Sequence, residues 1–321
     1  MTLATPRPEA AKLMAMLRYR RPAGSKTEKA FIREFLEPLG VERDAFGNLH
    51  KRIGDAPVLW SSHTDTVHSQ GGMQRLEVEG NIVKAAGASN CLGADCTTGV
   101  WLMAEMIQAG VPGLYVFHRE EEMGGGGSDF IARKTPGLLA GIHYAIAFDR
   151  MGTSSIITHQ AGARCCSDAF AVSLSEGLGL GMHLDDGGTF TDTANYVDIV
   201  GECTNISVGY KNQHRATETQ DIAFALSLRD ALLCLDLGRL VSHRSPGEIE
   251  YRNRMPKSYG SYRPGGWMDD AWWDDAAPRL PPSPTVRSLV KEYPDEIADW
   301  LEDNGINAHD LLDEVRQRGV L

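Results

Sequence analysis

Three consecutive glutamates, Glu120 to Glu122, follow a short apolar run, Leu114 to Phe117, and precede four glycines. Adjacent like charges repel one another, and a strand end that faces a pocket is an unfavourable place for them unless a positive charge is present. A divalent metal ion would supply that charge, with one carboxylate as a ligand and its neighbour free to act as a base. For these residues alone, a solvated acidic turn that closes a hairpin is an equally good explanation.

A histidine and an aspartate follow an earlier apolar run at 56–61. His63 and Asp65 are two positions apart, so their side chains point the same way in an extended chain. This arrangement suits a metal-binding histidine whose ring is oriented by a neighbouring carboxylate. A polar strand end without a ligand is the simpler alternative, and the pattern taken alone favours it.

Three further polar residues lie at the ends of expected elements. Asp95, with glycines on both sides, comes just before a helix expected over 98–109 and could simply cap it. The glycines also allow the backbone to approach a ligand closely. Asp149 follows an apolar run at 143–148, and His214 follows an expected strand at 203–210.

The elements around these residues alternate between strand and helix. We expect strands at 56–61, 114–117 and 143–148, and helices at 98–109 and 128–134. This alternation, with acidic strand ends, is typical of an open α/β sheet whose site lies at the carboxyl ends of the strands. A hairpin is expected around Gly80-Asn81, and helices over 192–200 and 219–241.

Composition limits the classes of function. The chain has 321 residues, of which 42% are hydrophobic and 23% charged, so it can bury a large core. A net charge of −11 without a basic run argues against nucleic-acid and anionic-membrane partners. We find no signal peptide and no apolar run long enough to cross a membrane. The six cysteines form no CxxC pair and indicate reduced thiols, which predicts a cytoplasmic protein.

The composition changes near Ser245, which predicts three parts. Residues 1–244 would form the catalytic domain, and 285–321 a small helical module. Between them, 245–284 is rich in Pro, Gly and Trp and is expected to be an extended linker.

The candidate site residues, taken together and in their order along the chain, give this sequence a resemblance to the co-catalytic dizinc exopeptidases. This superfamily contains leucyl-aminopeptidase-like, peptidase T-like and glutamate carboxypeptidase-like enzymes. The resemblance covers roughly residues 25–242. Leu92-Gly-Ala-Asp95 matches the bridging-aspartate motif of that superfamily, and Glu121-Glu-Met-Gly124 matches its Glu-Glu-x-Gly motif. The implied fold is α/β, with a mixed, largely parallel sheet between helices. The small helical appendage expected at the C-terminus lies outside the resemblance and rests on the composition of 285–321.

The resemblance implies a centre with two divalent ions, zinc or alternatively cobalt or manganese. Its seven residues divide by role: His63 and Asp149 hold one ion, Glu122 and His214 hold the other, Asp95 bridges both, Asp65 orients His63, and Glu121 is the general base. Two neighbouring cations need a shared anionic ligand, which is consistent with this assignment.

Two departures from the superfamily bear on function. Cys96 stands where these enzymes usually have Asp or Asn, and its thiol would either alter metal preference or simply pack. Only 65 positions separate Asp149 from His214, too few for the inserted lid domain of the peptidase T-like branch. This spacing favours a single-domain, aminopeptidase-like core.

The resulting hypothesis is a zinc-dependent hydrolase of amide bonds, acting as an exopeptidase on small peptides. The alternatives are an N-acyl amino acid deacylase or a carboxypeptidase with the same centre, and a non-catalytic metal-binding scaffold. The hypothesis allows a homo-oligomer. It leaves open which residue recognises the substrate. A substrate ammonium could bind Glu120 or Asp192, and a substrate carboxylate could bind Arg119, Arg150, Arg164 or Arg215.

Overall fold

The computed structural model describes residues 8–248, 250, 294 and 297. The chain divides into two units, Met1–Lys257 and Ser258–Leu321, and the fold described below is that of the first. The expected linker at 245–284 and helical module at 285–321 lie almost entirely outside the described residues, so both stay predictions.

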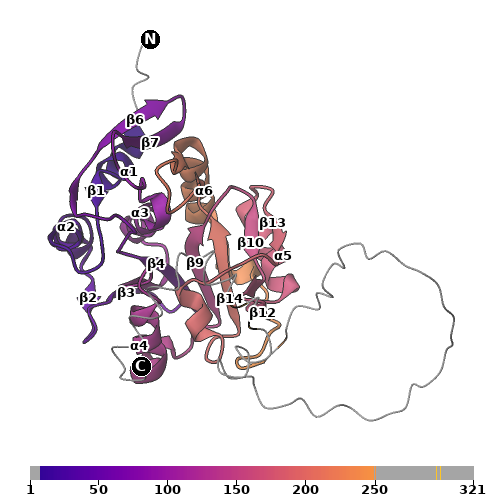
Figure 1. The fold of residues 1–321 in the computed structure, drawn as a ribbon. Helices are drawn as coiled ribbons and strands as arrows, with labels where there is room; N and C mark the ends of the chain where they lie inside the picture. The colour runs from indigo at the N-terminus through magenta and orange to yellow at the C-terminus, as the bar shows by residue number, and fades with distance from the viewer. Residues whose placement is uncertain (1–7, 249, 251–293, 295–296, 298–321) are drawn as a thin grey trace, which may run out of the picture. The chain divides into compact units, whose positions relative to one another are not determined.

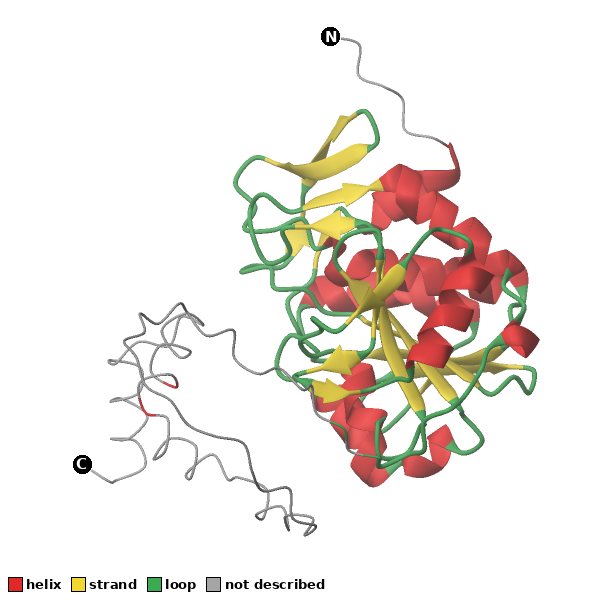
Figure 2. Ribbon diagram, turned by 90° about the vertical axis from the view of Figure 1, so that its right-hand side faces the viewer, coloured by secondary structure: helices red, strands yellow, loops and turns green. Residues whose placement is uncertain are grey.

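An eight-stranded sheet forms the centre of the first unit (Figures 1 and 2), in the order β13-β10-β14-β9-β4-β8-β3-β2. Its strands in chain order are β2 (Glu42–Arg43), β3 (Leu49–Ile53), β4 (Val58–His63), β8 (Gly113–His118), β9 (Tyr144–Arg150), β10 (Ser155–Ile157), β13 (His183–Asp185) and β14 (Glu202–Ser207). The four central strands β14, β9, β4 and β8 run parallel, and β13 runs parallel to β10. The pairs β10–β14, β3–β8 and β2–β3 are antiparallel. The expected mixed, largely parallel sheet is therefore confirmed.

Helices cover both faces of this sheet. On one face lie α1 (Ala11–Met16), α3 (Ala94–Ala109), α5 (Asp168–Leu178) and α6 (Ile222–Cys234), and on the other α4 (Gly126–Lys134) with the 3₁₀ helix η5 (Asp192–Tyr196). Every residue of β4, β8 and β14 is buried, because a parallel sheet covered on both faces has no solvated side. Neighbouring residues of β4 divide between the two cores, Leu59 facing α4 and Trp60 facing α3.

The N-terminal helical segment has a side-chain cap at its start and a glycine at its end. The helix α2 (Lys26–Phe31) is capped by Ser25, whose hydroxyl accepts a hydrogen bond from the Glu28 amide. A π-helical turn, η2 (Ile32–Leu36), and a 3₁₀ turn, η3 (Glu37–Leu39), continue it. Gly40 ends the segment with a φ of 69°, a left-handed conformation that glycine adopts without strain.

A smaller four-stranded sheet lies beside the large one and has the order β15-β16-β7-β6. Its strands are β6 (Arg75–Glu79), β7 (Ile82–Ala86), β15 (Tyr210–Lys211) and β16 (Thr219–Asp221). The hairpin of β6 and β7 turns at Gly80-Asn81, as expected from the sequence. Figure 1 shows this hairpin at the top of the view, above the large sheet.

Two short strand pairs and three 3₁₀ turns complete the described elements. The strand pairs are β1 (Tyr19–Arg20) with β5 (Gly72–Met73), and β11 (His159–Gln160) with β12 (Ala163–Arg164). The turns are η1 (Pro8–Ala10), η4 (Pro136–Leu139) and η6 (Leu237–Arg239). None of the helices built from described residues is both long and apolar enough to cross a membrane.

Two expected helices were wrong in extent. The helix expected over 219–241 is only α6. Thr219 to Asp221 pair with β7 as strand β16, and at the other end the extended backbone of Leu235 stops the helix before η6. Asp221 then caps α6 by accepting a hydrogen bond from the Phe224 amide. The helix expected over 192–200 is the single 3₁₀ turn η5.

Candidate metal centre

Three neighbouring parallel strands bring the first candidate residues together. The order β9-β4-β8 places the carboxyl ends of these strands at one edge of the sheet. His63 is the last residue of β4, Asp149 lies near the end of β9, and Glu121 and Glu122 follow β8. Because Ala147 pairs with Ser61, Asp149 lies level with His63.

Asp95 lies between the two histidines. Its Oδ1 is 3.1 Å from His63 Nε2, and its Oδ2 is 3.2 Å from His214 Nε2. The two oxygens of one carboxylate therefore face two imidazoles on different sides. This is the arrangement that a ligand shared between two cations requires.

Each histidine also contacts a second carboxylate. His63 Nε2 lies 3.5 Å from Asp149 Oδ1 and 4.0 Å from Glu121 Oε2. On the other side of Asp95, His214 Nε2 lies 3.1 Å from Glu122 Oε2. The structure thus brings all five expected ligands and the expected base into one cluster.

The donor set fits divalent metal ions. Two atoms bound about 2.0–2.1 Å from one tetrahedral zinc ion lie about 3.3 Å apart, close to the spacings within this cluster. Asp95, Glu122 and His214 form one group able to hold an ion, and His63 belongs to others that contain Asp149 or the glutamate pair. Glu122 Oε1 is buried and has no hydrogen-bond partner among the described residues, as expected for an atom left for a ligand.

Burial and neighbouring charges shift the pKa values of the cluster. Burial, followed by the charge of Asp95, raises the pKa of Asp149 to about 7. Burial likewise raises the pKa of Glu121 well above its ordinary value. The hydrogen bonds to Asp95 and Glu122 raise the pKa of His214 to about 11. A divalent cation at this place would stabilise the charged forms of these buried carboxylates.

Asp65 connects the histidine to the glutamate pair. Its Oδ1 lies 3.5 Å from His63 Nδ1, and its backbone carbonyl lies 3.1 Å from the same nitrogen. Its two carboxylate oxygens also accept hydrogen bonds from the backbone amides of Glu121 and Glu122, at 3.3 and 3.2 Å. The first contact is the one that the expected orienting role requires, whereas the second was missed because it joins two separate loops.

Three residues that the sequence did not assign to the centre hold Asp149. The Asn205 side chain accepts from the Asp149 amide at 2.9 Å and donates to its carbonyl at 2.7 Å. The Thr191 hydroxyl donates to Asp149 Oδ2 at 2.8 Å, and the Tyr210 hydroxyl lies 3.4 Å from Oδ1. Asn205 and Tyr210 lie in or just after strands expected from the sequence, but nothing in the pattern distinguishes them from packing residues.

Glu218 fixes the loop that carries Asp95. Its buried carboxylate accepts hydrogen bonds from the backbone amides of Leu92, Gly93 and Asp95, at 2.9, 2.8 and 3.1 Å. Sequence reasoning missed Glu218 because it is 123 positions from Asp95 and belongs to no recognised motif.

Replacing Glu218 with Gln should weaken metal binding by about 10–100-fold. The glutamine side chain has a single acceptor oxygen and cannot accept hydrogen bonds from all three backbone amides, so the loop that carries Asp95 is held less firmly. Glu202→Gln is the matched control. Glu202 is also buried and accepts from the amides of Ser167, His243 and Arg244, but away from the cluster. Metal titration of both variants checks this expectation, and equal metal affinities for the two would contradict it.

The residues around Asp95 differ from the simple helix cap considered above. Asp95 has a non-helical backbone, with φ −77° and ψ 105°, and the N-cap of α3 is Gly93, which makes no side-chain cap. The Cys96 thiol donates to the Phe148 carbonyl at 2.9 Å and lies 3.0 Å from the Ser62 hydroxyl. It is fully buried within 4.8 Å of ligand atoms of His63 and Asp149.

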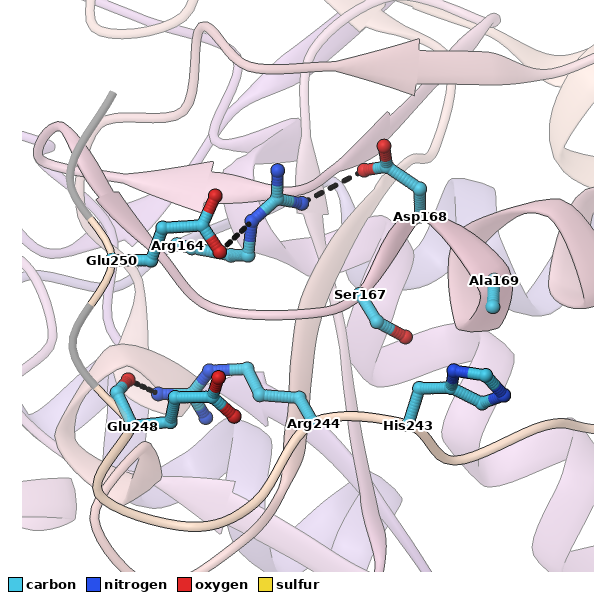
Figure 3. A pocket seen from close by; sticks show the side chains of 8 residues that line it. All are labelled: Arg164, Ser167, Asp168, Ala169, His243, Arg244, Glu248 and Glu250. Carbon is cyan, nitrogen blue, oxygen red and sulfur yellow. Dashed lines mark hydrogen bonds and ion pairs between the residues drawn. The ribbon is translucent and has the colours of Figure 1, made fainter. Parts of the chain in front are cut away.

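Three cavities are lined by arginines that the sequence offered as carboxylate-binding residues, namely Arg119, Arg150 and Arg164. A cavity of about 30 Å³ adjoins the candidate metal centre, with Asp149, Arg150 and Gln213 among its lining residues. A second, of about 310 Å³, lies at the start of α5 (Figure 3). There Arg164 contacts Asp168 at 2.8 Å and Glu250 at 3.0 Å, so its charge is already paired.

Comparison with known proteins gives matches at the level of structure alone. No family model matches the chain, and no curated protein sequence does. Solved structures with a similar fold include aminopeptidase PepT of Bacillus cereus (14% identity, TM-score 0.57, 71% of this chain and 98% of that one). A tripeptidase of Staphylococcus aureus is also similar (14% identity, TM-score 0.59, 74% of this chain and 100% of that one). The TET1 peptidase of Pyrococcus horikoshii is similar as well (15% identity, TM-score 0.51, 70% of this chain and 99% of that one). That peptidase can assemble into a tetrahedron or a large octahedral shell. The chain therefore has the fold of these aminopeptidases and tripeptidases, as the resemblance in its motifs led us to expect.

Proposed function

We propose that this protein is a metal-dependent hydrolase of amide bonds that acts as an exopeptidase on small peptides. The observation that carries the proposal is the position of Asp95, whose two oxygens lie 3.1 and 3.2 Å from the nitrogens of two histidines. Each histidine has its own further carboxylate. Two adjacent cation sites with a common anionic ligand are typical of metal-assisted hydrolysis.

We assign one ion to His63 and Asp149, the other to Glu122 and His214, and the bridge to Asp95. When bound, two zinc ions would lower the pKa of a water molecule and polarise the carbonyl of the scissile amide. Asp65 orients His63 and, through its contacts with two backbone amides, holds the glutamate pair in place.

Glu121 is the proposed general base. Its carboxylate faces His63 at 4.0 Å, beyond the range of the shorter contacts that the proposed ligands make. It can accept a proton from the attacking water and donate it to the leaving amine, so that water and amide give a carboxylate and an amine. A non-catalytic scaffold would not need a carboxylate in this position.

The similar folds favour an exopeptidase over the deacylase alternative. The described segment between Asp149 and His214 forms β10 to β15 and η5 within the same unit, so no separate lid domain interrupts it. The similar solved proteins are named as an aminopeptidase and a tripeptidase. By analogy with the assemblies of the TET1 peptidase, we also propose a homo-oligomer.

Protein purified without chelator and reloaded with zinc should contain two zinc ions per chain, because the cluster offers two sites joined by Asp95. Elemental analysis at saturation measures the ratio, and addition of cobalt or manganese compares the metals. A protein that takes up no zinc and gains no activity with it would contradict the proposal. A panel of aminoacyl anilides, dipeptides and N-acyl amino acids then separates the exopeptidase from the deacylase.

A further inference from the structure

Arg150 lies beside the metal centre without being one of its ligands. It directly follows Asp149 in β9, and both residues line the cavity of about 30 Å³ that adjoins the cluster. Gln160 and Gln213 also line this cavity, as does the apolar Phe190, which is 40% exposed. A substrate group that enters this cavity would therefore lie beside both Asp149 and Arg150.

The guanidinium of Arg150 is held in a fixed orientation but is not fully used. Its Nη2 contacts Asp185 Oδ2 at 3.0 Å, and Asp185 Oδ1 is itself fixed by the amide of Gly187 at 2.7 Å. Its Nε is buried and has no hydrogen-bond partner among the described residues. An arginine offers five N–H donors, so a single contact with Asp185 leaves most of them available.

The other candidate arginines are placed differently. Arg164 is paired with two carboxylates in the cavity of Figure 3. Arg119 contacts the buried Glu28 at 3.5 Å and lines a different cavity. Of the four arginines that the sequence offered, including Arg215, Arg150 alone lines the cavity beside Asp149.

We propose that Arg150 determines substrate specificity by binding a carboxylate of the substrate. This inference rests on the proposed exopeptidase function and adds the chemical class of its substrates. The planar guanidinium suits paired hydrogen bonds to a carboxylate, and Asp185 keeps the plane in place. Asp149 and Asp185 are the acidic groups near this carboxylate, but the first faces His63 and the second is paired with Arg150. Both an acidic side chain and a free C-terminus supply this chemistry.

The test uses pairs of substrates that differ only in charge. Glutamyl against glutaminyl p-nitroanilide reports on an acidic side chain, and Ala-Ala against Ala-Ala-amide reports on a terminal carboxylate. In at least one pair the zinc-loaded protein should prefer the charged member. In Arg150→Gln the preference, as a ratio of kcat/KM values, should fall by about 10–100-fold, as expected when a charge-assisted hydrogen bond is lost. The rate on the charged member should fall by more than the rate on the uncharged member.

Arg164→Gln is the matched control, because its side chain has the same 20% exposure and an ion pair of similar length, but lies in the other cavity. It should keep the preference unchanged. Arg150→Lys retains the charge without the planar fork and should give an intermediate preference, which also covers a failure of Arg150→Gln to fold. Equal zinc content in all variants ensures that the comparison concerns the substrate alone.

Absence of any preference in the unmodified protein, or a preference that survives in Arg150→Gln, would overturn the inference. If none of the four compounds is hydrolysed, the proposed function has failed, and binding decides the inference separately. Calorimetry with the same compounds on the zinc-loaded protein should then show tighter binding of the charged member, lost in Arg150→Gln. Equal binding of both members would overturn the role of Arg150.

Discussion

Replacing Glu121 with Gln should lower turnover by about 10²–10⁴-fold while both metal ions stay bound. The amide keeps the size and much of the hydrogen bonding of the carboxylate but cannot accept the proton of the attacking water. Glu121 is the carboxylate at 4.0 Å from His63, whereas Glu122 is the one at 3.1 Å from His214. Removal of the base should therefore separate the loss of chemistry from the loss of metal.

The two neighbouring glutamates provide the controls. Glu122→Gln should weaken one metal site, with activity partly recovered at high zinc, because Glu122 contacts His214. Glu120→Gln should do neither, since Glu120 has a left-handed backbone with φ 62° and forms the turn before the pair. Metal content and turnover are measured side by side for the three variants. Near-normal turnover in Glu121→Gln would overturn the assignment of the base.

Replacing Asp95 with Asn should cause the other large loss, because one residue is proposed to serve both ions. A neutral amide provides one good acceptor in place of two, and it removes a negative charge from between two cations. We expect the second ion to bind more than about 100-fold more weakly, with turnover falling in parallel at limiting zinc.

Asn205→Asp serves for comparison, because it keeps an acceptor for the Asp149 amide but loses the donor to the Asp149 carbonyl. This variant should weaken the binding of only the ion that is assigned to Asp149. Calorimetric zinc titration resolves the number of sites and their affinities in each variant. Two sites of unchanged affinity in Asp95→Asn would show that Asp95 is not the bridge.

The sequence predicted the strands of the centre because their side chains carry local signals. The apolar runs that end in His63, Asp149 and the glutamates are continuous, as expected for strands buried on both faces. Once these strands are parallel neighbours, the clustering of their carboxyl ends follows from topology. The candidate site residues at the strand ends could therefore be proposed from the sequence alone.

The supporting residues could not be predicted because their contacts join distant parts of the chain. Glu218 reaches the Asp95 loop across 123 positions, and Asn205 reaches Asp149 across 56. The start of α6 was predicted wrongly for a related reason. The sequence expectation extended the helix back over Thr219 to Asp221, but pairing with β7 takes these polar residues into a strand. Tertiary pairing here outweighs the local pattern.

The two histidines of the centre differ greatly in their access to solvent. The His63 side chain is 1% exposed at the end of a central strand, whereas the His214 side chain is 48% exposed on the loop between β15 and β16. His214 also has a left-handed backbone with φ 62°, which is uncommon for a residue with a side chain. The ion assigned to His214 should therefore exchange faster than the ion assigned to His63. Brief treatment with a chelator should leave a form with a single ion, so the number of ions per chain would reflect how long the protein has been exposed to low metal.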